Sequence, residues 1–220
     1  MKRWEFTGEE KVVSGITLKR IRATATFEMK NGIKIEAGEK GGWIEKEENL
    51  YGDAWVSGNA QVSGNAQVSG NARVSGNARV SGNAQVYGNA WVYGNAWVSG
   101  NAWVYGNARV SGNAQGSGNA RVYDDAWVYG DAWVYGNAHY FKIGPAGSRN
   151  DYTIFTRNKA GTIYVSCGCF FGTIAEFREK VKQRHGDNKH AKVYLAAADL
   201  AELQIDTTPI GSETEPPKEE

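Results

Sequence analysis

The chain of 220 residues has few cysteines, little net charge and no long apolar run. Its two cysteines, Cys167 and Cys169, exclude a disulfide-dense secreted scaffold and favour a reducing compartment. The net charge of +1 gives no electrostatic reason to expect a membrane or a specific nucleic-acid partner. The N-terminus is too polar for a signal peptide, and no apolar segment approaches the roughly 20 residues of a membrane span. We therefore expect a cytoplasmic protein.

Glycine, in contrast, is abundant, and most of its 28 copies recur at a spacing of six residues. The repeat Gly-Asn-Ala-x-Val-Ser/Tyr runs from Gly52 to Phe141, fifteen hexads in all. In a strand, Val points inward while its two neighbours point outward. Gly-Asn recurs where the chain must turn, since both residues tolerate positive φ. Each hexad therefore predicts one short strand and one corner, and the valines are buried only when coils stack.

This pattern resembles the hexapeptide repeat of left-handed β-helices, in which three hexads form one triangular coil. In that family an aliphatic residue and a small residue four positions later point inward, a spacing that Val56 and Ala60 match. The resemblance implies a mainly β protein with a left-handed parallel β-helix of about five coils, and it also implies a homotrimer. The handedness comes from the resemblance alone, because the usual preference for right-handed crossovers predicts the opposite.

We divide the chain into four parts, with the repeat at 52–141. A small β cap at 1–51 is needed because a solenoid end exposes unpaired strand edges. Residues 142–206 form a small C-terminal α/β domain. Residues 207–220 are rich in Pro and Glu, and we expect them to be disordered.

Two strands and two helices are predicted in the C-terminal domain. The strands are 152–156 and 162–169, on the basis of their apolar and β-branched residues. The first helix begins at the capping box of Thr173 and Glu176 and ends at Gly186. The second follows Asn188.

With three hexads per coil, the x positions form three outward rows. The first row is Trp55, Arg73, Trp91, Arg109 and Trp127. The second is Gln61, Arg79, Trp97, Gln115 and Trp133. The third is Gln67, Gln85, Trp103, Arg121 and His139, beside a row of Ser69, Tyr87, Tyr105, Tyr123 and Phe141.

Three interpretations of these rows remain open. The aromatic and guanidinium groups can stack on one another, which stabilises any β-helix. They can form an oligomer interface, since this much exposed Trp and Tyr is unusual for a monomer. They can also bind a ligand, because Trp stacks on rings and Arg binds phosphate. The ligand-binding candidates are Trp91, Arg109, Trp127, Trp103, Arg121 and, on a loop of the C-terminal domain, Arg149.

Two hexads depart from the pattern. Gly116 stands where Val is expected, and Asp124 stands where Gly is expected. Losing a buried Val forgoes about 1.5–3 kcal/mol of burial. Either drift or a local need for room explains Gly116.

Cys167 and Cys169, with His185 and His190, raise the question of zinc. One residue between two cysteines is tighter than structural zinc sites usually allow. We expect no metal and no cofactor, and we interpret both cysteines as half-buried strand residues.

Two further strings resemble hexapeptide-repeat proteins carried by bacteriophages and prophages. They are Gly-Gly-Trp-Ile-Glu-Lys-Glu-Glu-Asn-Leu at 41–50 and Val-Ser-Cys-Gly-Cys-Phe at 165–170. The resemblance implies a phage accessory protein made in the cytoplasm of a bacterial host. It supplies no established activity.

Catalysis is not expected. Acyltransferases with hexapeptide repeats use a histidine base, and here the repeat contains only His139, with no loop insertion nearby. We expect a non-catalytic phage accessory protein that binds, and sequesters, a host-made anionic nucleotide-like signal. A structural scaffold and a hexapeptide-family acyltransferase are the alternatives.

Overall fold

The computed structural model describes residues 2–30, 32–123, 126–128, 130, 132–134, 139–158 and 160–208. The chain forms two compact units, Met1–Asp131 with Pro216–Glu220, and Ala132–Glu215. Asp124, the side chain of Trp133 and most of the tail predicted to be disordered, 209–220, lie outside the described part.

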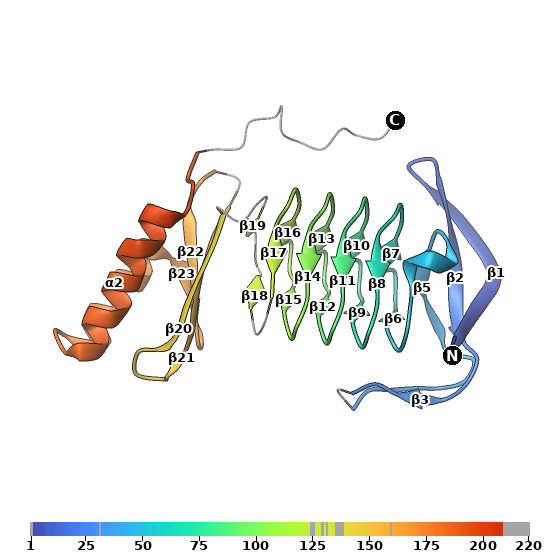
Figure 1. Cartoon of the computed structure of the whole chain (residues 1–220), viewed down its shortest axis with the longest axis horizontal. Helices are drawn as coiled ribbons and strands as arrows, with labels where there is room; N and C mark the ends of the chain where they lie inside the picture. Colours follow the sequence, from blue (N-terminus) through green and yellow to red (C-terminus); the bar gives the residue numbers. More distant parts are fainter. Residues whose placement is uncertain are drawn as a thin grey trace. The chain divides into compact units, whose positions relative to one another are not determined.

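A parallel β-solenoid of about five turns dominates the N-terminal unit (Figure 1). In this unit each hexad contributes one two-residue strand, made of x and the next residue, which is Val everywhere except at Gly116. The strands are β6 (Trp55–Val56), β7 (Gln61–Val62), β8 (Gln67–Val68), β9 (Arg73–Val74), β10 (Arg79–Val80), β11 (Gln85–Val86), β12 (Trp91–Val92), β13 (Trp97–Val98), β14 (Trp103–Val104), β15 (Arg109–Val110), β16 (Gln115–Gly116), β17 (Arg121–Val122) and β18 (Trp127–Val128). They form three parallel sheets, which include β6-β9-β12-β15-β18 and β8-β11-β14-β17. Every third hexad therefore shares a face, as predicted.

The solenoid core consists of the small and aliphatic residues of the repeat. Each described Ala and Val of the hexads from Ala54 to Val128 is at most 2% exposed. Backbone hydrogen bonds link each coil to the next, for example from Gln61 N to Ala78 O at 2.9 Å. The prediction that both Val and Ala point inward is confirmed.

The corners differ from the prediction in the role of asparagine. Glycine alone takes the positive φ, as at Gly82 with 64°, and no described Asn of the repeat does so. A Cβ on Gly82 would lie 3.0 Å from the backbone nitrogen of Gly100 in the next coil. The Asn side chains instead form ladders along the corners, such as Asn65 Nδ2 to Asn83 Oδ1 at 3.3 Å.

The N-terminal cap extends one face of the solenoid as a sheet. It contains β1 (Trp4–Val13), β2 (Ile16–Ala23), β3 (Phe27–Glu28), β4 (Lys34–Ile35), β5 (Lys40–Ile44) and the short helix η1 (Glu47–Asn49). β1, β2 and β5 are antiparallel, and β5 then pairs in parallel with β7, so that Ile44 lies opposite Val62. Leu50 likewise bridges to Val68. Regular coil pairing therefore begins before the first hexad.

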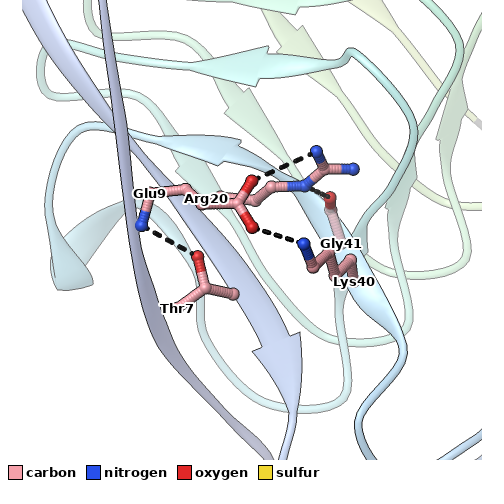
Figure 2. A network of polar contacts seen from close by, with 5 residues as sticks. All are labelled: Thr7, Glu9, Arg20, Lys40 and Gly41. Atoms are coloured by element: carbon pink, nitrogen blue, oxygen red, sulfur yellow. Dashed lines mark hydrogen bonds and ion pairs between the residues drawn. The ribbon is translucent and has the colours of Figure 1, made fainter.

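A charged network links three of the cap strands, β1, β2 and β5 (Figure 2). The carboxylate of Glu9 on β1 accepts hydrogen bonds from Lys40 on β5 and from Arg20 on β2. Arg20 Nε also donates to the carbonyl of Gly41 at 3.2 Å. The hydrogen bond from Lys40 is the main reason that the pKa of Glu9 lies below its ordinary value.

The C-terminal unit is a four-stranded antiparallel sheet with two helices. Its elements are β19 (Trp133–Val134), β20 (Tyr140–Ala146), β21 (Asp151–Arg157), β22 (Ile163–Cys167), β23 (Phe170–Thr173), α1 (Ile174–His185) and α2 (Lys189–Gln204). The sheet order is β20-β21-β22-β23. Phe155, Val165, Phe177 and Tyr194 are among the buried residues of its core.

The predicted helices are confirmed, and so is the strand predicted at 152–156, which lies within β21. Thr173 and Glu176 form the capping box of α1, and Asn188 caps α2. The strand predicted at 162–169 is β22, but it ends at Cys167, because Gly168 takes a φ of 60° and turns the chain into β23. β20 was missed, since Tyr140 and Phe141 continue the hexad pattern although β20 pairs with β21.

Candidate functional site

The predicted rows exist where the structure describes them. On the first face, Trp55, Arg73, Trp91, Arg109 and Trp127 are register partners from one coil to the next. On the third face, Gln67, Gln85, Trp103 and Arg121 are register partners. His139 directly precedes β20 and stands in no solenoid strand. Of the predicted ligand-binding residues, Trp91, Arg109 and Trp127 thus share the first face. Trp103 and Arg121 share the third.

On the first face, the candidate side chains contact their own neighbours. The Cζ atom of Arg73 lies 5.0 Å from the ring centre of Trp91, and that of Arg109 lies 5.9 Å from Trp127. Burial lowers the pKa of the half-buried Arg73. The indole Nε1 of Trp127 donates to Ser111 Oγ at 3.1 Å. Trp91 and Trp127 are therefore each held by an arginine and a serine hydroxyl of the preceding coil, which supports the self-stacking interpretation.

The first residue of this row, Trp55, is covered by the cap. Trp55 is 1% exposed, and Phe27 of the cap strand β3 packs edge-on against it at 5.8 Å between ring centres. Trp55 keeps the outward position of the row, in register with Arg73, but it is not exposed, because the cap folds over it. Its indole Nε1 is buried without a hydrogen-bond partner in the described part of the chain.

The third face carries a stack of tyrosines. Tyr87 and Tyr105 lie 5.0 Å apart with rings 2° from parallel, and Tyr123 continues the stack at 5.4 Å. Arg121 lies 5.1 Å from the ring centre of Trp103. The stacked faces cover one another, so this row presents ring edges to its surroundings.

Arg149 belongs to the C-terminal unit, whereas the other five candidates belong to the N-terminal unit. It lies on the turn between β20 and β21 and lines a cavity of about 190 Å³ with Cys167, Cys169 and residues of both helices. The sequence singled out Arg149 but not the cavity around it.

The cysteines occupy different positions. Cys167, at the end of β22, is half-buried, and its Sγ accepts a hydrogen bond from Thr153 Oγ1 at 3.3 Å. Cys169 is exposed in the hairpin turn, so its assignment as a half-buried strand residue is wrong. Across the described residues, no group of three or more Cys, His, Asp or Glu side chains is placed to hold a metal ion.

A model of the YdcK β-solenoid repeat matches five stretches of the chain, residues 66–82, 72–88, 84–100, 102–118 and 114–130. These stretches are similar to that solenoid repeat. Each stretch is about as long as one coil, and together they include the strands β8 to β18. No curated protein matches the chain. In the part of the chain that the structure describes, no helix has the length and apolarity needed to cross a membrane.

Two sets of contacts on the solenoid were not predicted from the sequence. The first is the asparagine ladder, in which Asn77 both accepts from Asn59 and donates to Asn95. The second is the bond from a Trp indole to a Ser hydroxyl sixteen residues earlier. The eighteen-residue period of Asn and the Ser-to-Trp spacing are the signals that point to them.

Proposed function

We propose that the chain is a non-catalytic protein whose β-solenoid serves as a rigid scaffold. The observation that supports this most directly is the mutual bonding of outward side chains along the stack. Asn side chains bond at the corners, and indoles bond hydroxyls of the preceding coil. Such contacts between coils stabilise stacked strands and leave these groups occupied with one another.

Removal of one whole coil tests the scaffold. Deletion of residues 73–90 joins Ala72 to Trp91 and preserves the hexad pattern on both sides. We expect the shortened chain to fold and to unfold in one cooperative transition, as measured by circular dichroism. Its association state should be the same as that of the parent chain. A control deletion of 73–81 breaks a hexad and should disrupt folding. A shortened chain that fails to fold while the control folds would contradict the scaffold.

The non-catalytic character has its own test. His139, the single histidine of the predicted repeat, is 8% exposed, which disfavours contact with a substrate. Incubation with acetyl-CoA and acceptor amines or alcohols should show no turnover. Turnover that is lost in His139→Ala, with the fold intact, would make the chain an acyltransferase.

The third face is the proposed surface for a homotrimer. Tyr123 is 36% exposed, and the tyrosine stack runs along three coils beside Trp103. We expect light scattering at micromolar concentration to give three times the mass of one chain. Tyr105→Glu should dissociate the assembly, whereas Gln61→Glu on another face should not. A monomeric parent protein would overturn the assignment.

A second candidate function is the binding of an anionic nucleotide-like ligand, as a phage protein would use to sequester a host-made signal. The exposed pair Arg109 and Trp127 favours it, since Trp127 remains 39% exposed. A base would stack on the indole while its phosphate accepts hydrogen bonds from the guanidinium. Contacts of this kind can reach micromolar affinity, about −8 kcal/mol.

Calorimetry with cyclic dinucleotides and ADP-ribose derivatives tests this second candidate. We expect heat from at least one member of the panel, and loss of binding in Arg109→Ala. Arg79→Ala is the matched control, since Arg79 is an exposed arginine at the same repeat position on another face. Equal effects of the two substitutions would remove the first face from consideration.

A further inference from the structure

The cavity in the C-terminal unit is built from four separate segments. Arg149 comes from the turn after β20, Phe170 from the start of β23, Lys180 and Arg184 from α1, and Tyr194 from α2. On α1, the lining residues Phe177, Lys180, Val181 and Arg184 recur at the i, i+3, i+4 and i+7 spacing of one helix face. One face of α1 thus presents both its apolar and its cationic residues to the cavity.

The charge around this cavity is of one sign. Arg149, Lys180 and Arg184 line it together with His185, and none of the described residues that line it is an Asp or a Glu. Within the described part of the chain, these three cations make no ion pair and no side-chain hydrogen bond. Three cationic side chains line the cavity, and no acidic side chain is among the described residues that line it, which favours the binding of an anion there.

Arg178 on the same helix shows the contrast. Its Nη2 lies 2.7 Å from Asp199 and 2.8 Å from Glu202, both on α2. Arg178, which does not line the cavity, is therefore neutralised by α2, while Lys180 and Arg184, which line it, have no acidic partner among the described residues. Lys180 and Arg184 are like charges four residues apart on α1, an arrangement that destabilises a helix by a few tenths of a kcal/mol.

The helix dipole explains only part of this arrangement. Cations in the last turn of a helix interact favourably with its C-terminal end, which accounts for Arg184 and for Lys182. It does not account for Lys180, which precedes that turn, or for Arg149, which lies on another segment. A shared anionic ligand accounts for all the cations that line the cavity.

The backbone is shaped to hold Arg149 at the cavity. A Cβ on Gly168 would lie 2.8 Å from Nε and 2.9 Å from Cζ of Arg149, so the guanidinium packs directly on a bare glycine. Tyr194 fits against Gly147 in the same way, and its hydroxyl oxygen accepts a hydrogen bond of 3.2 Å from Ser148 N. The loop that carries Arg149 is thereby tied to α2.

We infer that this cavity binds the phosphate end of a small nucleotide-like ligand. Arg149, Lys180 and Arg184 would donate to the phosphate, and the apolar residues Phe170 and Phe177 would contact the attached ring. The volume of about 190 Å³ is below the roughly 300–1,000 Å³ of typical ligand pockets, so only part of a larger ligand enters. The inference rests on the proposed class of ligand but not on the solenoid face.

Calorimetry on the full chain with AMP, inorganic phosphate and adenosine tests the inference. AMP should bind most tightly, phosphate more weakly, and uncharged adenosine at least about tenfold more weakly than AMP, a factor that corresponds to about 1.4 kcal/mol. Arg149→Gln/Arg184→Gln should weaken AMP binding at least about tenfold. Both side chains are exposed, so the double variant should fold, which its thermal unfolding will show. Lys182→Gln is the matched control, because it removes an exposed cation of α1 that does not line the cavity.

The outcomes separate the site from the ligand class. AMP binding that is weakened by the double variant and unchanged in Lys182→Gln supports the cavity. Binding that survives the double variant but is lost in Arg109→Ala overturns the cavity and leaves the solenoid face as the site. Equal losses in the double variant and in Lys182→Gln would show a non-specific charge effect and overturn the cavity. No binding of AMP, phosphate or the cyclic dinucleotides would overturn both the cavity and nucleotide binding.

Discussion

The indole Nε1 of Trp91 donates a 3.0 Å hydrogen bond to Oγ of Ser75, sixteen residues earlier in the chain. Ser75 directly follows β9, the strand that pairs with β12, which carries Trp91. The indole of Trp91 therefore extends toward the preceding coil. Trp97 makes the same bond to Ser81 at 3.3 Å on another face. The repeat therefore uses Ser after Val as an acceptor for Trp in the next coil.

Ser75→Ala should lower the free energy of unfolding by about 0.5–1.5 kcal/mol, because it removes one hydrogen bond and leaves an indole N–H without its partner. Urea unfolding followed by circular dichroism measures the change. Ser69→Ala is the matched control, since the residue sixteen positions after Ser69 is Gln85 rather than Trp. An equal loss in both variants would show that the hydroxyl–indole bond contributes nothing specific.

The asparagine ladder predicts a dependence on position along a corner. Asn77 makes side-chain bonds of 3.3 Å to Asn59 and 3.2 Å to Asn95, whereas Asn59 ends the ladder and makes one. We expect Asn77→Ala to cost about twice as much as Asn59→Ala, at about 0.5–1.5 kcal/mol for each bond. Chemical denaturation of the two variants gives the ratio. A cost that is no greater at Asn77 than at Asn59 would contradict a role for the ladder.

Gly116 leaves unfilled space in the solenoid core. It is buried opposite Val98, and a Cβ placed on it would meet no atom of the described residues within 4 Å, its two chain neighbours aside. Gly116→Val should therefore raise the free energy of unfolding by about 0.5–2 kcal/mol, by filling this space. Gly100→Ala is a control of opposite sign, because Gly100 has a φ of 62° and its Cβ would lie 2.9 Å from the nitrogen of Gly118. A lower midpoint of unfolding for Gly116→Val would mean that the space is needed.

His139 predicts a loss of stability in acid. Burial lowers its pKa below the ordinary value of 6.5, and Arg157 lowers it further, while Asp206 opposes the shift. As the pH falls below 6.5, the unfolded chain takes up a proton that the folded chain does not, so the free energy of unfolding falls until the folded-state pKa is passed. Above 6.5 the residue contributes no pH dependence.

Thermal unfolding at pH values of about 7.5 and about 5.5 measures this effect. In His139→Asn, the difference in melting temperature between the two pH values should shrink. His190→Asn removes an exposed histidine of α2 and serves as the control. If the control shrinks the difference as much as His139→Asn does, the buried histidine is not the cause.

The sequence by itself determined the solenoid. Its period of six fixes which residues turn, and the pairing of Val with Ala fixes which side faces inward, because a two-residue strand has only two faces. Stacking at three hexads per coil then orders the rows of Trp and Arg. The sequence also predicted that helices begin after Thr173 and Asn188, since capping depends on residues within one turn.

Only the tertiary structure decided where the rows end and where the C-terminal cations meet. Trp55 has the same repeat position as Trp91, yet Phe27 of the cap covers it. Phe141 fits the hexad pattern but belongs to β20, because its antiparallel partner Phe155 offers a longer strand than the solenoid does. Arg149 and Arg184 are 35 positions apart in the chain and line one cavity only because the hairpin at Gly168 and the two helices close around it. Local patterns fix local turns and faces, whereas contacts between distant segments depend on which surfaces pack together.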